Sequence, residues 1–126
     1  MVQLRKNFLN KFHEFKDLDI SFIMVSEEDG CTFHFDAGPS CTIYDGRQSC
    51  CEHRWMTCDD DLNEHRGSRL LGAELLDDSC EPGENDYEHD IVFLRIDTTT
   101  GSFKLVMHNS HNGCYGGFAP EIRDGS

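Results

Sequence analysis

The hydrophobic residues between positions 4 and 18 follow a helical spacing. Large apolar side chains recur every three or four residues, at Leu4, Phe8, Phe12, Phe15 and Leu18. Charged residues fill most of the positions between them, which is typical of an amphipathic helix. This stripe has the form of a docking face for a partner, but we favour a role in the core, because such a face beside a sheet is usually buried.

After position 18 the period of the pattern changes to two, which is typical of strands. Alternating runs at 20–25, 31–35 and 41–44 are separated by the acidic turn 27–30 and by the Gly- and Pro-containing segment 36–40. The pattern predicts an antiparallel meander. In its first strand it places three residues on one face: Ile20, Phe22 and Met24.

The second half of the chain contains the clearest hairpin. Residues 92–96 and 103–107 alternate on either side of a short turn rich in Thr and Gly. An earlier apolar run at 70–76 is interpreted as a strand, or as a turn followed by a strand. Residues 77–90 combine Pro, Gly and Asn with many acids and are predicted to form an exposed loop, and the polar residues 119–126 a frayed tail.

These elements predict an α+β fold with a twisted, mainly antiparallel sheet of about five or six strands. One N-terminal amphipathic helix is expected to pack on a face of that sheet. A length of 126 residues suits a single domain covering 1–126. The edges of such a sheet also allow pairing into a homo-oligomer.

The charge of the chain narrows the range of partners. There are 24 Asp and Glu residues against 11 Lys and Arg, giving a formal net charge of −13. This field repels a phosphate backbone, so we expect no direct binding of nucleic acid. Mimicry of nucleic acid by the acidic residues at 59–61 and 77–90 stays open as an alternative. No segment approaches the roughly 20 apolar residues of a membrane span, so no membrane role is expected.

The seven cysteines are interpreted as thiols of a reducing, cytoplasmic compartment. Their number is odd, and the neighbours Cys50 and Cys51 are poor disulfide partners. In addition, the first residues carry charges where a secretion signal has an apolar run.

Two clusters contain side chains suited to chemistry. The first is the run Cys50, Cys51, Glu52, His53 and Arg54. It offers zinc-ligand types without the paired spacing of a structural zinc site, so we favour a core role for one thiol. The second cluster is His108, His111 and Cys114, which supplies the three protein ligands that a catalytic zinc needs. The neighbouring Asn and Gly residues also suit a tight turn that needs no metal.

No nucleophile elbow, phosphate-binding loop or dinucleotide motif is present in the sequence, so an enzyme is not the favoured interpretation. The leading hypothesis is a binding protein whose ligand is a host protein or a small anionic molecule. Its surface would combine the two clusters and the glycine-rich loop: Cys50, Cys51, Glu52, His53, Arg54, His108, Asn109, His111, Asn112, Tyr115 and Phe118. The alternative is a zinc-binding module or enzyme that uses His108, His111 and Cys114.

The order of these landmarks resembles a family of small, uncharacterised proteins of bacteriophages and related mobile elements. That family carries a Cys-Cys-Glu motif, a segment like Gly-x-x-Ile-x-x-Ala-Glu, and a strand pair ending in Asn-Gly-Tyr-Tyr-Gly. The matching segments here are 50–52, 72–74, 93–106 and 110–117, with Cys114 where the family has an aromatic residue. The resemblance covers residues 16–118. It implies a compact α+β domain of viral type in the host cytoplasm, which binds and blocks a host defence protein or sequesters a ligand.

Overall fold

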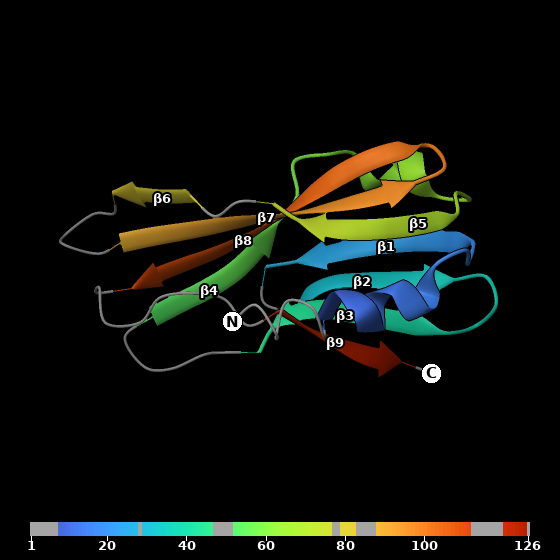
Figure 1. The fold of residues 1–126 in the computed structure, drawn as a ribbon, viewed down its shortest axis with the longest axis horizontal. Helices are drawn as coiled ribbons and strands as arrows, with labels where there is room; N and C mark the ends of the chain where they lie inside the picture. The colour runs from blue at the N-terminus through green and yellow to red at the C-terminus, as the bar shows by residue number, and fades with distance from the viewer. Residues whose placement is uncertain are drawn as a thin grey trace.

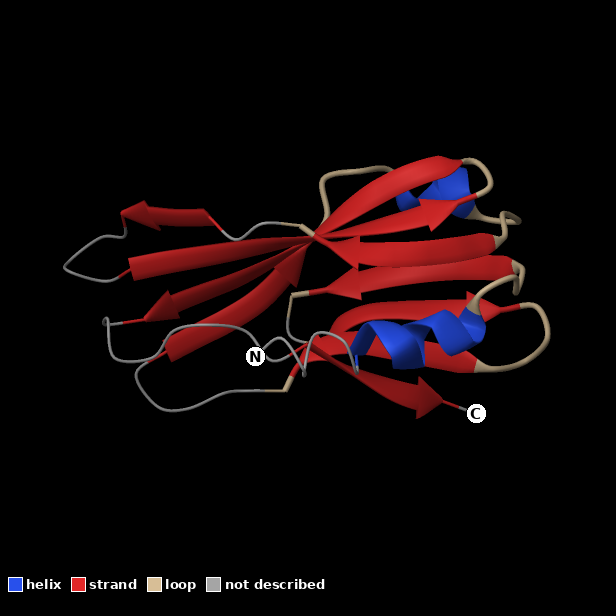
Figure 2. Ribbon diagram, in the orientation of Figure 1, coloured by secondary structure: helices blue, strands red, loops and turns tan. Residues whose placement is uncertain are grey.

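A computed structural model describes residues 8–27, 29–46, 52–76, 79–82, 88–111 and 120–125. Strands dominate the described chain (Figure 2). A helix over 8–12 runs directly into the 3-10 helix η1 (His13–Phe15), and a second 3-10 helix, η2, spans Leu62–His65. Among the described residues, no helix has the length and apolar character needed to cross a membrane.

The first sheet contains four antiparallel strands in the order β1-β2-β3-β9. These strands are β1 (Ile20–Ser26), β2 (Gly30–Phe35), β3 (Ser40–Asp45) and β9 (Pro120–Gly125). The meander predicted between positions 20 and 44 is therefore confirmed. The fourth strand comes from the C-terminal end of the chain and pairs with β3, placing Ile122 opposite Ile43.

The second sheet contains five antiparallel strands, with β4-β8-β7-β5 as its main order and β6 paired with the beginning of β7. The strands are β4 (Glu52–Thr57), β5 (Leu70–Leu75), β6 (Ser79–Pro82), β7 (Glu88–Thr98) and β8 (Gly101–His111). The long hairpin of β7 and β8 confirms the strand pair predicted at 92–107. In Figure 1, β4, β6 and the adjoining parts of β7 and β8 extend away from the N-terminal helix.

Both sheets contribute to one hydrophobic core around Phe33 of β2, which is fully buried. The Phe33 ring lies 5.4 Å from that of Phe12 in the helix, in an edge-to-face arrangement. On the opposite sheet, the ring of Phe103 lies 6.2 Å from Phe33. Phe8 and Phe15 are also buried, so the described part of the helical stripe serves the core, as expected from the sequence. The helix predicted to reach Leu18 ends at Phe15, and Leu4 lies outside the described residues.

The described chain has nine strands rather than the five or six expected from the sequence. The sequence pattern predicted a loop at 77–90 and a tail at 119–126. In the structure, β6 and the first residues of β7 lie within that loop segment, and β9 lies within the tail segment. Those predictions were wrong because pairing to a neighbouring strand stabilises segments whose own composition favours turns. In β9, burial of Ile122 between polar neighbours adds to the backbone pairing.

The face assignment within β1 also differs from the prediction. The register shifts between Ile20 and Phe22, which is the signature of a bulge. Ile20 and Ile23 consequently both point into the core, whereas Met24 is 59% exposed. A strict period of two had placed Ile20, Phe22 and Met24 on one face, and a single extra residue is enough to reverse the alternation.

The contacts that join the two sheets include a backbone bridge and an ion pair. An isolated bridge pairs Asp19, just before β1, with Arg69, just before β5. At the other side, Arg54 of β4 donates to Asp45 at the end of β3, with 2.6 Å between Nη1 and Oδ2. Both side chains are nearly inaccessible, with 3% exposure for Arg54 and 10% for Asp45. The second junction is therefore a buried ion pair.

Removing one partner of this pair leaves a buried charge without its counter-ion. We expect Arg54→Met to lower the free energy of unfolding by about 3 to 5 kcal/mol, measured by urea denaturation. The matched control is Arg69→Met, which removes an exposed pair with Asp19 and is expected to cost less than about 1 kcal/mol. Equal losses in the two variants would contradict the assignment of the Arg54 pair as a structural junction.

Three cysteines belong to the interior or border it. Cys31 and Cys41 are buried, and Cys58 is half-buried. Burial raises the pKa of the Cys41 thiol to about 12, and it raises the pKa of Cys31 well above the ordinary value. Burial also raises the pKa of Cys58, although a hydrogen bond with the backbone of Asp60 lowers it.

Because only the thiolate is nucleophilic, Cys31 and Cys41 should resist alkylation in the folded protein. Among these three cysteines, we expect iodoacetamide at pH 8 to modify Cys58 in the native protein and Cys31 and Cys41 only after unfolding in urea, as followed by peptide mass spectrometry. Rapid modification of Cys41 in the native protein would show that its thiol is not buried.

Candidate functional site

Pairing of β4 with β8 brings the two clusters found in the sequence side by side. His53 lies opposite Ser110, Arg54 opposite Asn109, and Trp55 opposite His108. Segments separated by about fifty positions in the chain therefore form one surface at the extended end of the second sheet. The sequence pattern predicted that the strand ends near His108 and continues as a loop. This prediction was wrong up to His111, because β8 includes that residue, and His111 pairs with Glu52 of β4.

One face of this strand pair carries three stacked rings, those of His53, Trp55 and His108, which we call the aromatic ladder. The Trp55 and His108 rings are nearly parallel, with an interplanar angle of 2° and a centroid separation of 4.7 Å. The His53 ring, from the same strand as Trp55, also stacks with the Trp55 ring, with a centroid separation of 4.8 Å. This geometry follows from the pleat, because residues two apart on one strand and opposite across a pair share a face.

A hydrogen bond holds the end of the ladder. The Thr57 hydroxyl lies 2.8 Å from Nε2 of His108, across the same strand pair. His53 is exposed, whereas Trp55 and His108 are half-buried. The ladder is thus a fixed aromatic surface that remains accessible to another molecule.

The other face of β4 and β8 points inward. Arg54 and Asn109, both expected from the sequence to contact a ligand, are 8% and 0% exposed. Arg54 is held by Asp45, as described above, and Met56 and Met107 lie further along the same face. These side chains are buried beneath the strand pair and are not part of the exposed surface that carries the aromatic ladder.

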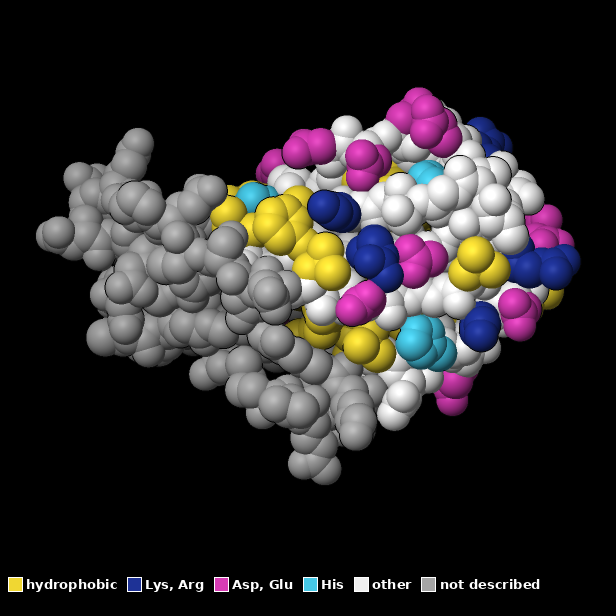
Figure 3. All heavy atoms as spheres, turned by 45° about the horizontal axis from the view of Figure 1, so that its top comes forward, with side chains coloured by type: hydrophobic (Ala, Val, Ile, Leu, Met, Phe, Trp, Pro, Cys, Tyr) yellow, Lys and Arg dark blue, Asp and Glu magenta, His cyan; other side chains and the backbone are white. Residues whose placement is uncertain are grey.

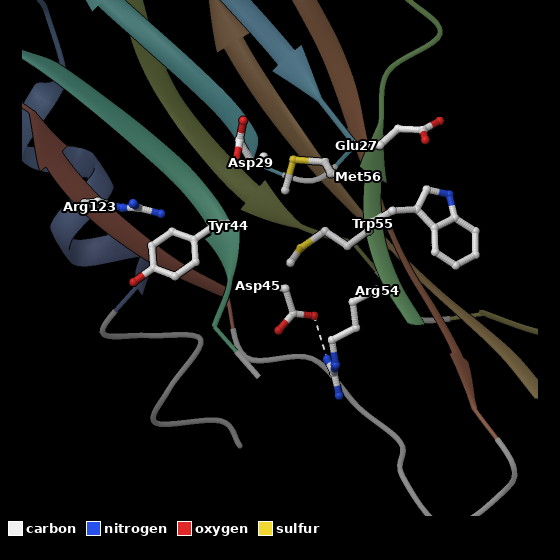
Figure 4. Close-up of a pocket in the computed structure, with 10 residues that line it drawn as sticks. Glu27, Asp29, Tyr44, Asp45, Arg54, Trp55, Met56 and Arg123 are labelled. Carbon is white, nitrogen blue, oxygen red and sulfur yellow. Dashed lines mark hydrogen bonds and ion pairs between the residues drawn. The ribbon is translucent and has the colours of Figure 1, made fainter. Parts of the chain in front are cut away.

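A pocket of about 250 Å³ opens on this inner side. Figure 4 shows side chains that line it, with the Trp55 ring and the Glu27 carboxylate pointing away from the cavity. The lining comes from the β1–β2 turn, the end of β3, β4, β8 and β9: Glu27, Asp29, Gly30, Tyr44, Asp45, Arg54, Trp55, Met56, Met107 and Arg123. Strand β4 therefore separates the pocket from the aromatic ladder.

Tyr44 and Arg123 form one side of the pocket. The Arg123 guanidinium carbon lies 4.7 Å from the centroid of the Tyr44 ring, a cation–π arrangement. Partial burial and the interaction with the Glu121 carboxylate raise the pKa of the Tyr44 hydroxyl, while the positive charge of Arg123 lowers it. The Arg123 guanidinium thus packs against the Tyr44 ring and keeps its positive charge.

The zinc hypothesis stays a prediction. Of its three ligands, only the side chain of His108 is described, and its Nε2 is engaged by Thr57. Cys114 lies outside the described residues, and His111 is described by its backbone alone. The described residues contain no group of three His, Cys, Asp or Glu side chains arranged to hold a metal ion.

Several other residues of the expected binding surface lie outside the described part of the chain, namely Cys50, Cys51, Asn112, Tyr115 and Phe118. Glu52 is described by its backbone alone, which pairs with His111. Among the predicted residues with described side chains, His53 and His108 meet on the ladder, whereas Arg54 and Asn109 lie on the opposite face. The two clusters are therefore adjacent, but they divide between two sides of the strand pair.

The acidic residues do not form one dense patch on the face drawn in Figure 3. Carboxylates lie apart there, with Lys and Arg side chains between them. Arg95, for example, is paired with both Asp97 and Glu74 on the outside of the second sheet. A mimic of nucleic acid would need a continuous track of negative charge, and this face does not provide one.

Trp55 is the central residue that the sequence reasoning missed. Its signal was the alternation of His53, Trp55 and Thr57, which indicates one face of a strand. The carboxylates Glu27 and Asp29 were also missed, because nothing in the sequence indicates that the β1–β2 turn folds beside β4.

Comparison with known proteins gives a family but no activity. A family model described as a domain of unknown function (DUF7448) matches residues 6–119. No curated protein and no solved structure matches the chain. Because the family model covers β1 to β8, including the whole of the β4–β8 pair, the chain belongs to the DUF7448 family of domains of unknown function.

Proposed function

We propose that this protein is a non-enzymatic binding protein of phage type, which docks on a host protein in the cytoplasm and blocks it. The contact surface would be the aromatic ladder on β4 and β8. The observation that carries the proposal is the stack of His53, Trp55 and His108, in which the only tryptophan of the chain contacts two imidazole rings.

The ladder has the properties of an interface centre. Tryptophan is enriched among residues that dominate binding energy, and it supplies a large contact area at low entropic cost. The two ring contacts and the Thr57 hydrogen bond fix the rings before binding, so little further order is needed on association. The half-buried state of Trp55 leaves part of its surface for a partner.

The shape of this surface favours a protein over a small ligand. The ladder lies on the face of a strand pair, whereas sites for small molecules are concave. The pocket that the protein does contain lies on the opposite side of β4, and one of its two arginines, Arg54, is already paired with Asp45. The small anionic ligand considered from the sequence is therefore the less favoured alternative.

The proposal predicts that truncation of Trp55 abolishes partner capture. In affinity capture from a bacterial lysate with quantitative mass spectrometry, at least one protein should be retained by the wild type and lost with Trp55→Ala. Loss of at least about 2 kcal/mol, or about thirtyfold in affinity, is expected for a central interface residue.

The matched control is Met24→Ala, which truncates an exposed apolar side chain on the other sheet. Circular dichroism should show that both variants remain folded. The proposal is contradicted if no protein distinguishes the wild type from Trp55→Ala, or if Met24→Ala loses the same partner to the same degree.

A further inference from the structure

We infer that the outer face of the first sheet is the contact surface of a homodimer, in which a second copy of this chain packs against the same face. This surface, which we call the neutral face, is formed by outward-pointing residues of β1, β2 and β3: Phe22, Met24, Thr32, His34, Thr42 and Tyr44. It belongs to the other sheet from the aromatic ladder, and the inference does not rest on the proposed function.

The strand register places these side chains on one face. Thr32 lies opposite Met24 of β1 and opposite Thr42 of β3, and residues opposite each other in an antiparallel pair share a face. The next residue of β2, Phe33, is buried against the helix and the second sheet. Because successive residues of a strand point to opposite sides, the neutral face is the outward side of the sheet.

The neutral face differs from the chain as a whole in its charge. Asp, Glu, Lys and Arg make up 28% of the chain, but none of them is among the residues of this face. Two copies that each carry a net charge of −13 repel one another. Because repulsion falls with the distance between charges, a face without charged side chains allows two copies to approach at the lowest electrostatic cost.

The side chains of the neutral face are suited to burial against another protein. Met24 is a large apolar side chain that is 59% exposed, and the Phe22 ring stacks on the His34 ring at 4.2 Å. The hydroxyl oxygens of Thr32 and Thr42 lie 2.9 Å apart and share a hydrogen bond. Since this bond is kept when the face is covered, burial of the two hydroxyls costs less than burial of polar groups without a partner.

Strand β9 identifies a second copy as the occupant. Arg123 lies opposite Thr42 and Glu121 lies opposite Tyr44, so a positive and a negative side chain border the neutral face. Arg123 packs on the Tyr44 ring and forms no ion pair with another described residue. With a two-fold axis that runs across the strands, the two β9 strands meet in reverse directions, which places Arg123 of one copy opposite Glu121 of the partner subunit. The border of the face is therefore complementary in charge to itself.

The size of the face sets the strength of the dimer. Strands about 4.8 Å apart, with outward side chains every 6.6 Å or so, give this four-stranded sheet a face of roughly 500 Å². Two such faces bury about 1,000 Å² in total, which is at the lower limit for a specific interface. We therefore expect a reversible dimer with a dissociation constant in the micromolar range.

Sedimentation velocity of the full chain, from micromolar to submillimolar concentration, tests the inference. We expect a concentration-dependent shift from monomer to dimer. Met24→Lys places like charges at the centre of the contact and should weaken the dimer by about tenfold or more. The matched control is Leu71→Lys, which makes the same change at an exposed apolar residue of β5, outside the face, and should leave the dimer intact. Trp55→Ala should also leave it intact, so failure of the ladder proposal can be distinguished from failure of this one.

Charge reversal tests the role of a second copy directly. Arg123→Glu and Glu121→Arg should each weaken the dimer by up to about fivefold, because each places like charges opposite one another. The two changes alter the net charge of the chain in opposite directions, so a general charge effect would move the dissociation constant in opposite directions. The double variant exchanges the two charges and should restore the dimer.

Three results would overturn the inference. The first is a monomer at every concentration. The second is a dimer that Met24→Lys does not weaken, or that Leu71→Lys weakens to the same degree. The third is opposite effects of the two single charge reversals. Circular dichroism of each variant verifies that the fold is retained.

Discussion

The structure depends on the burial of Phe33 between two layers. Its ring meets Phe12 of the helix on one side and Phe103 of the second sheet on the other, and Phe35 lies beside it on the same strand. Contacts among such rings combine a large buried area with a preferred geometry. The helix, the meander and the long hairpin are thus held against each other by one residue at the centre of β2.

One end of the second sheet lies beyond this core. The paired ends of β7 and β8 extend away from the helix, and β4 joins them along β8 (Figure 1). Strand β4 then has two different faces. One presents the aromatic ladder, and the other places Arg54 and Met56 against the pocket, with the Arg54 ion pair tying the strand to β3. A binding surface and a cavity therefore share one rigid support.

Much of the architecture is accessible from local pattern. The hairpin around Phe103 and the aromatic stripe of the helix are local features, so their periodicity alone predicts them. Strand β9 is different, because its polar sequence becomes a strand only where β3 provides a partner and Ile122 a buried position. The bulge at Ile20 likewise reflects the pairing with β2, and no periodicity reveals it.

In the candidate site, too, some features follow from the local sequence and others depend on the pairing of distant strands. The His53 and His108 segments were each recognisable as concentrations of reactive side chains, but their adjacency depends on the register of β4 against β8. Register also decides that Arg54 and Asn109 turn inward while Trp55 faces outward. The pocket could not be predicted, because it is assembled from turns and strand ends that are distant in the sequence.

The most direct test of this account is the proximity of the Trp55 indole to the His108 imidazole. Proton nuclear Overhauser spectroscopy of the native protein should show cross-peaks between the two rings, since their centroids are 4.7 Å apart and their planes nearly parallel. Cross-peaks between the Trp55 ring and the ring of His53 should accompany them. Absence of contacts between the Trp55 and His108 rings in a folded sample would contradict the register of β4 against β8, and with it the aromatic ladder.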